Sequence, residues 1–184
     1  AVTTSANDFT LTHAGALTLT DVDTTTGAMT ISTTSGAIAA NDVDATEGAV
    51  SITTTSGNIT ATEVDTTTGN ITLDTDSGTI ALTDVDTASG AIDVDATGNI
   101  TVTANGGVAA SGAGNININS STGYIRNSAT SDTTADITTV NGTLTLEAST
   151  GIADSDNSNG LEIDSGTGAV SLTVDGTGAL WVDA

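Results

Sequence analysis

Pairs of acidic residues recur at a fixed interval near the start of this chain, and they are the residues best suited to chemistry. In each pair the two acids flank one valine, as in Asp21-Val22-Asp23, and the next pair follows 21 residues later. If the repeats stack, the pairs lie about 4.8 Å apart, where two unit charges repel by roughly 0.9 kcal/mol in bulk water. A hard cation such as Ca²⁺, which prefers carboxylate and carbonyl oxygens, would remove this repulsion. The candidate Ca²⁺ ligands are Asp21, Asp23, Asp42, Asp44, Glu63, Asp65, Asp84 and Asp86.

The acidic pairs also have a plainer interpretation, as a solvated edge that is screened by salt. The calcium-binding nonapeptide Gly-Gly-x-Gly-x-Asp does not occur in the sequence. Catalysis is not indicated, because His13 is the only histidine and Arg126 is the only Lys or Arg. The acids recur with the repeat, as structural residues do. We therefore expect no enzymatic activity, no catalytic residue, and Ca²⁺ as the only candidate cofactor.

The composition limits the partners and the setting of the chain. Its 184 residues include 23 acids against one Lys or Arg, which gives a formal net charge of −22. We expect no nucleic-acid partner, because phosphate binding needs Lys and Arg. No apolar stretch is long enough for a membrane span, so no membrane insertion is expected. The acidity and the abundant Thr, Ser, Asn and Gly favour an extracellular or cell-surface location.

The acidic pairs belong to a repeat that predicts the fold. Glycines at 27, 48, 69 and 90, and at 36, 57, 78 and 98, each precede a short segment in which apolar and polar residues alternate. Alternation with a period of two predicts strands, and short strands that recur in one direction must climb in a coil. The sequence therefore predicts an all-β, right-handed parallel β-helix, or β-solenoid, with about 21 residues per turn in the first half. Each turn should contain two strands and one short apolar contact, which is made by a valine such as Val43 or Val64.

The second half keeps the strand pattern but loses the strict period. We divide the chain into an N-terminal edge segment, 1–14, regular solenoid repeats over 15–103, and irregular solenoid turns over 104–184. The irregular part contains a predicted inserted loop, 128–135, and a glycine-rich corner at 106–114. The strands predicted there are 115–119, 124–127, 136–140, 143–147, 161–164, 169–174 and 179–182.

The repeats resemble those of filamentous haemagglutinin-like adhesins and related giant β-strand-repeat surface proteins. The resemblance lies in strings such as Gly57-Asn58-Ile59-Thr60 and Gly69-Asn70-Ile71-Thr72-Leu73, and it extends from about Gly15 to Val182. It implies a right-handed β-helix, an extracellular setting, and a role in adhesion or in building a matrix.

Together these observations predict a structural extracellular protein, a β-solenoid fibre or adhesin segment. It would self-associate end to end, mediate surface attachment, or do both, because the open edges of a solenoid invite further strands. The expected partners are further copies of the chain or the continuation of a longer solenoid, divalent cations, and glycans. The alternative is an ice- or carbohydrate-binding solenoid module, which is suggested by outward threonine pairs such as Thr18/Thr20 and Thr60/Thr62.

Overall fold

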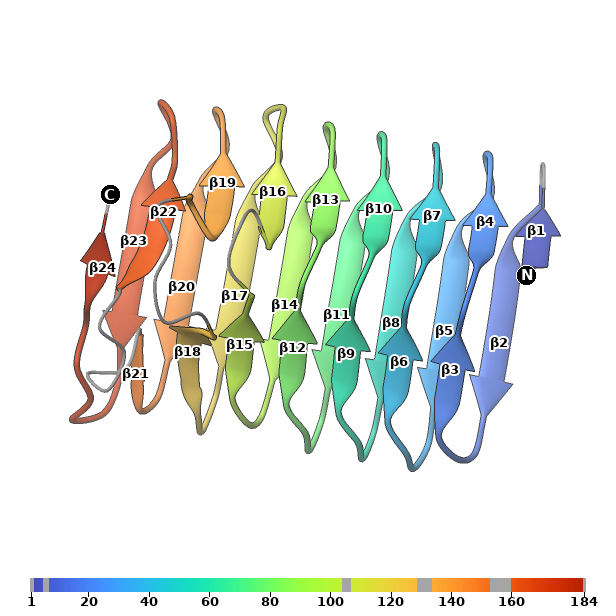
Figure 1. Cartoon of the computed structure of the whole chain (residues 1–184), viewed down its shortest axis with the longest axis horizontal. Helices are drawn as coiled ribbons and strands as arrows, with labels where there is room; N and C mark the ends of the chain where they lie inside the picture. Colours follow the sequence, from blue (N-terminus) through green and yellow to red (C-terminus); the bar gives the residue numbers. More distant parts are fainter. Residues whose placement is uncertain (1, 5–6, 104–106, 129–133, 153–159, 184) are drawn as a thin grey trace.

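In the computed structural model the chain forms a β-solenoid whose strands are all parallel to their neighbours (Figure 1). The structure describes residues 2–4, 7–103, 107–128, 134–152 and 160–183. Within these residues there is no helix, and hence none that could cross a membrane. Val22, Val43 and Val64 pair with one another in register at intervals of 21 residues. The all-β parallel solenoid predicted from the repeat is therefore confirmed.

Three parallel sheets, which we name A, B and C, form the walls of the solenoid, and consecutive strands lie in different sheets. Sheet A has nine strands: β1 (Val2–Thr4), β4 (Val22–Thr24), β7 (Val43–Ala45), β10 (Val64–Thr66), β13 (Val85–Thr87), β16 (Val108–Ala110), β19 (Ile137–Thr139), β22 (Leu161–Asp164) and β24 (Val182–Asp183). Sheet B has eight strands: β2 (Phe9–His13), β5 (Met29–Thr33), β8 (Val50–Thr54), β11 (Ile71–Thr75), β14 (Ile92–Ala96), β17 (Ile116–Ser120), β20 (Leu144–Ala148) and β23 (Val170–Val174). Sheet C has seven strands: β3 (Leu17–Leu19), β6 (Ile38–Ala40), β9 (Ile59–Ala61), β12 (Ile80–Leu82), β15 (Ile100–Val102), β18 (Tyr124–Asn127) and β21 (Gly151–Ile152).

The core is a narrow column of aliphatic side chains between the three sheets. Alternate strand residues point inward, so Ile31 and Ile52 on sheet B are fully buried and stand over one another. Ile38 and Ile59 form an equivalent column on sheet C. Burying one such side chain contributes about 1.5–3 kcal/mol, and the stacking repeats that contribution in every coil.

Each coil contains three strands, which corrects the predicted two strands and one apolar contact. The segment Val22–Thr24 is the strand β4, in which Val22 and Thr24 are buried and Asp23 faces outward. The threonine is accepted in the core because its Oγ1 donates a hydrogen bond of 2.8 Å to the carbonyl oxygen of Gly27. A polar residue at an inward position hid the alternation that marks this strand.

The described residues of the predicted edge segment 1–14 form a coil of the solenoid. Val2 of β1 pairs with Val22, and Phe9 of β2 pairs with Met29. These pairs are 20 residues apart rather than 21, so they fall outside the strict period that marks the repeats. Residues before Gly15, where the regular repeats were expected to begin, therefore already belong to the solenoid.

The second half of the chain follows the same plan with longer corners. The glycine-rich corner expected at 106–114 contains the strand β16, which the sequence analysis missed because two of its three residues are alanine. Residues 129–133 of the predicted inserted loop 128–135 lie outside the described residues. The intervals between paired strands grow here, as between Ile116 and Leu144, which are 28 residues apart.

The corner glycines stack on one another so closely that no side chain fits between them. A Cβ atom at Gly69 would lie 1.9 Å from the carbonyl oxygen of Gly48, and one at Gly48 would lie 1.9 Å from that of Gly27. The same contact repeats between Gly90 and Gly69 at 1.8 Å. Such distances are far below van der Waals contact, so glycine is required at this corner whatever its backbone dihedral angles.

We expect Gly69→Ala to destabilise the fold by about 1–3 kcal/mol, because the new methyl group would force neighbouring coils apart. Thermal or urea unfolding followed by circular dichroism measures the loss. Gly15→Ala is the matched control, since its nearest contact would be the His13 Nε2 atom at 3.7 Å, an ordinary distance. Equal stability of the two variants would contradict the role of the stacked corners.

Candidate metal centre on sheet A

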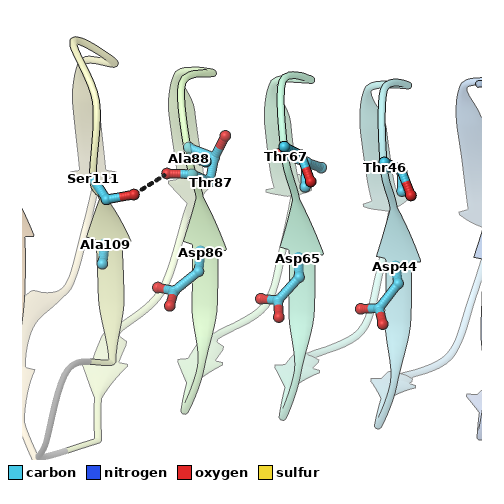
Figure 2. A pocket seen from close by; sticks show the side chains of 11 residues that line it. Asp44, Thr46, Asp65, Thr67, Asp86, Thr87, Ala88, Ala109 and Ser111 are labelled. Carbon is cyan, nitrogen blue, oxygen red and sulfur yellow. Dashed lines mark hydrogen bonds between the residues drawn. The ribbon is translucent and has the colours of Figure 1, made fainter. Parts of the chain in front are cut away.

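The acidic residues inside the strands of sheet A form one row along the outside of the solenoid. Asp44 of β7, Asp65 of β10 and Asp86 of β13 pair with one another in register, and Figure 2 shows their carboxylates side by side. Asp23 of β4 continues the row on one side, and Ala109 of β16 ends it on the other. The row exists because the strands stack without a shift, so the acid at one position of the repeat meets the acid at the same position of the next.

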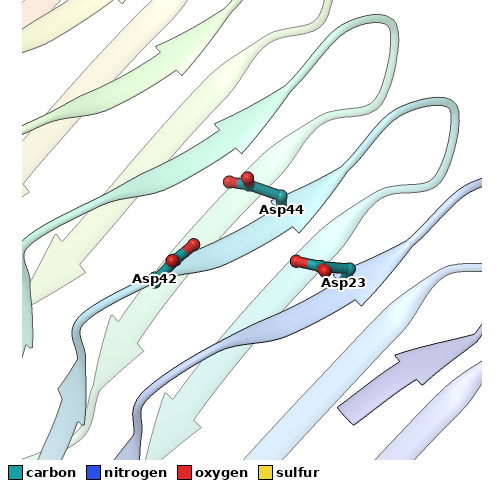
Figure 3. Close-up of side chains that lie close together, drawn as sticks. All are labelled: Asp23, Asp42 and Asp44. Atoms are coloured by element: carbon teal, nitrogen blue, oxygen red, sulfur yellow. The ribbon is translucent and has the colours of Figure 1, made fainter. Parts of the chain in front are cut away.

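Acids that precede the strands join this row to form two compact groups. One carboxylate oxygen from each of Asp23, Asp42 and Asp44 lies within 4.8 Å of the other two. Figure 3 shows these three side chains close together. The second group follows two coils later and is composed of Asp65, Asp84 and Asp86.

Two of the eight predicted ligands are in neither group. Asp21 precedes the first strand of the row, and Glu63 has an exposed side chain. The sequence thus predicted a continuous ladder, whereas the structure gathers six of the eight acids into two separate triplets. The difference arises because the acids before the strands lie in corners, where side-chain direction is not fixed by the strand alternation.

The row borders an open groove with a volume of about 370 Å³ on the outside of sheet A. Carboxylates line one side of the groove, and Thr46, Thr67, Ala88 and Ser111 line the other (Figure 2). The Oδ1 atoms of the three strand aspartates are shielded from solvent and have no hydrogen-bond partner. The groove therefore offers oxygen ligands in a setting that stabilises a bound cation or proton.

The only Lys or Arg of the chain does not neutralise the row. Arg126 lies on β18 in sheet C, where its guanidinium carbon is 4.4 Å from the centre of the Tyr124 ring. His13, the only histidine, is exposed at the end of β2. The described residues thus place no basic side chain in the groove.

The environment of the row makes the strand aspartates weaker acids. Burial, followed by the charges of Asp86 and Asp84, raises the pKa of Asp65 to about 7. Burial and the neighbouring charge of Asp84 raise the pKa of Asp86 to about 6. The pKa of Asp44 is raised as well, by burial first and then by Asp42 and further acids. Asp65 and Asp86 thus take up protons at about pH 7 and about pH 6, where free aspartates are ionised.

A second acidic cluster lies on the outer face of sheet B, and the sequence analysis did not single it out. Asp74, Asp76 and Asp95 border a groove of about 180 Å³ together with Asn119. Asn119 donates a hydrogen bond of 3.1 Å from Nδ2 to Asp95 Oδ1, and burial followed by neighbouring acids raises the pKa of Asp74. The sequence does carry a signal for this cluster, since β11 and β14 have aspartates at outward positions. The prediction of metal ligands considered only the acids that flank the valines of the repeat, so it did not include them.

The raised pKa values predict that stability falls as the pH rises. In the folded state Asp86 and Asp65 bind protons with pKa values of about 6 and about 7. The stability that these protons add is complete below pH 3.8, the ordinary pKa of aspartate, and is lost as the pH rises through the two folded-state pKa values. With a chelator present to remove divalent cations, we expect the free energy of unfolding to fall by about 1 kcal/mol between about pH 5 and pH 8. This loss corresponds to a decrease in Tm of about 2–4 °C. Asp65→Asn should flatten this dependence and raise Tm at the upper pH.

Asp175→Asn is the control for this pH dependence, because it removes the same charge from an exposed position outside the row. An unchanged pH profile in Asp65→Asn, or an equal change in Asp175→Asn, would contradict the assignment.

The two triplets predict a specific response to Ca²⁺. At neutral pH we expect Ca²⁺ to raise Tm well above the value in Na⁺ of equal ionic strength, because a divalent ion can bridge carboxylates of two coils. Differential scanning calorimetry measures the difference, and Asp65→Asn combined with Asp86→Asn should reduce it. Identical Tm values in the two salts would show that the row is only screened, as an acidic edge would be.

The chain matches no protein-family model, no curated protein and no solved structure. The resemblance to filamentous haemagglutinin-like adhesins noted in the sequence therefore rests on the repeat motif alone. The chain is a repeat protein of the parallel β-solenoid type.

Proposed function

We propose that this chain is a structural, non-enzymatic segment of an extracellular or cell-surface protein, a β-solenoid fibre or adhesin segment. It associates end to end, serves in surface attachment, or does both. The observation that supports the proposal is the contrast between the inner and the terminal coils of the described solenoid. The inner coils bury their aliphatic columns completely, whereas the terminal coils leave the same columns open.

The contrast can be followed along a single column of sheet B. Ile116 and Leu144 are 0% exposed, and the next residue in the column, Val170 of β23, is 41% exposed. Near the same end of the solenoid, Leu180 is 53% exposed and Trp181 is 44% exposed. A further coil on this end would bury these side chains, as each coil buries those of the coil before it.

The other end of the solenoid shows the same contrast. Val2 of β1 is 42% exposed, while Val22, its partner in the next coil, is buried. Phe9 and Leu11 of β2 are only partly buried, while their partners Met29 and Ile31 are fully buried. Both ends thus present apolar surface and strand edges suited to continued pairing.

The acidic surface supports the remaining parts of the proposal. A net charge of −22 keeps rods from associating side by side and leaves their ends as the favoured contacts. Divalent cations at the acidic triplets would lower the repulsion between coils and thus stabilise the rod. We further propose glycans as partners in attachment, since the outer faces carry many hydroxyl and amide groups and no phosphate-binding basic patch.

One observation favours the alternative, an ice- or carbohydrate-binding module. The outer faces of β2, β5 and β8 carry an in-register array of hydroxyl groups with no charge, and within it Ser32 Oγ donates a hydrogen bond of 3.1 Å to Thr12 Oγ1. The array is composed of Thr10, Thr12, Thr30, Ser32, Ser51 and Thr53. Thr18 and Thr60, two of the outward threonines noted in the sequence, lie instead on sheet C with Ala39 between them.

Electron microscopy and light scattering of the purified chain test the proposed function. We expect filaments, or a molar mass that rises with concentration, at micromolar concentration and neutral pH in the presence of Ca²⁺. A monodisperse monomer over the whole accessible concentration range would contradict end-to-end association and would favour the binding module.

A further inference from the structure

We propose that the outer face of sheet C carries a binding site for a sugar with a single carboxylate group, formed around Tyr124 and Arg126. This inference rests on the proposed function and deepens it, since it gives the proposed glycan partner a location and a chemical class. The partner is an otherwise neutral glycan that ends in one carboxylated sugar, such as a uronic acid or a sialic acid.

Sheet C differs from the other two sheets in its charge. The described strands of sheet C contain no Asp or Glu, whereas sheet A carries the acidic row and sheet B carries Asp74 and Asp95. The outward residues of sheet C that pair in register are Thr18, Ala39, Thr60, Ala81, Thr101 and Arg126. The single Lys or Arg of a chain with 23 acids thus lies on the one sheet whose strands have none. An anion can therefore approach Arg126 along strands that carry no acid of their own.

The Arg126 side chain is held by the ring of Tyr124 rather than by an acid. Both residues point outward from β18, which lies between β15 and β21 (Figure 1). The guanidinium carbon is 4.4 Å from the centre of the Tyr124 ring, a distance typical of a cation–π contact. Among the residues that the structure describes, none forms a salt bridge with Arg126. The guanidinium can therefore donate its N–H groups to a carboxylate without first giving up an acidic partner.

A small hollow lies beside Tyr124 on the same face. Its volume is about 130 Å³, and Tyr124, Thr150, Gly151 and Ala179 line it. The hollow exists because Gly151 pairs in register with Tyr124 and has no side chain to fill the surface of the next coil. It is smaller than the pockets of about 300–1,000 Å³ that enclose drug-sized ligands, so it suits one sugar ring rather than a buried chain of sugars.

The groups around the hollow match those of a sugar. The apolar C–H face of a sugar ring packs on an aromatic ring such as that of Tyr124, and the hydroxyl group of Thr150 can exchange hydrogen bonds with sugar hydroxyls. The planar guanidinium of Arg126 can donate two parallel hydrogen bonds to a carboxylate. The site thus combines a surface for the ring with a donor for its acid group.

The charge of the whole chain limits the ligand to one negative group. Arg126 supplies a single positive charge on a chain whose net charge is −22. An extended polyanion would place its remaining charges near the other acids of the chain, with no second Lys or Arg to pair with them. A glycan with one carboxylate at its end avoids this repulsion.

Ligand-observed NMR titrations with two matched probes test the inference. Methyl glucuronide carries a carboxylate where methyl glucoside carries a hydroxymethyl group, and the two are otherwise identical. We expect the glucuronide to bind with a Kd of about 1 mM or weaker, as is normal for so small a ligand. It should bind roughly tenfold more tightly than the glucoside, because hydrogen bonds to charged groups are worth about that factor. N-acetylneuraminic acid is titrated in parallel, and the tighter of the two acids identifies the sugar class.

Variants of the two residues separate a built site from general attraction to a positive charge. Arg126→Gln should abolish the preference for the glucuronide. Tyr124→Leu should weaken its binding several-fold, whereas Tyr124→Phe, which keeps the ring face, should bind nearly as the unmodified chain does. Circular dichroism checks that each variant folds.

The matched control is Arg126→Gln combined with Thr60→Arg, which moves the charge to another outward position of sheet C with no tyrosine beside it. It should not restore binding. Equal binding of the two methyl glycosides, an unchanged preference in Arg126→Gln, or restored binding in the control would overturn the site.

The outcome can be separated from that of the proposed function. Filaments of a chain that binds neither acid would overturn the site and leave the fibre proposal standing. Binding of the glucuronide by a chain that remains monomeric at every concentration would support the site and contradict end-to-end association.

Discussion

The close stacking of corner glycines is the constraint on which the rest of this structure depends. Gly27, Gly48 and Gly69 approach so closely that their backbones touch. Buried threonines hold two of these corners from inside, since Thr24 Oγ1 donates to Gly27 O at 2.8 Å and Thr66 Oγ1 donates to Gly69 O at 2.6 Å. Each coil is thereby held directly over the one before it. Once the corners are aligned, the strands between them can pair only in register.

The acidic row is a consequence of the same alignment. A repeat that brings Ile over Ile must also bring Asp over Asp, so the packing that stabilises the core concentrates charge outside it. The pKa of Asp65 is raised by burial first and then by the charges of Asp86 and Asp84, so part of this shift reflects the repulsion between stacked acids. Protons lower this cost, which links the stability of the solenoid to the pH of its surroundings, and a bound divalent cation would lower it as well.

The sequence was sufficient to predict the architecture because its period is long, regular and shared by apolar and polar positions. It failed where the signal depended on side-chain environment: β4 was missed because Thr24 is buried as a hydrogen-bond donor, and β16 because it contains two alanines. For the acidic site, the period correctly aligned the strand aspartates. It could not place Asp21 or Glu63, because corner side chains do not follow strand alternation.

A distance between spin labels on one row of sheet B tests the in-register stacking most directly. Thr30 and Thr145 face outward in the same row, and the pairing order β5-β8-β11-β14-β17-β20 separates them by five strand steps. With labels at these two positions, pulsed electron paramagnetic resonance should give a single narrow distance of about 24 Å, or five times the strand spacing. A broad distribution, or a separation far from this value, would contradict a continuous stack of coils.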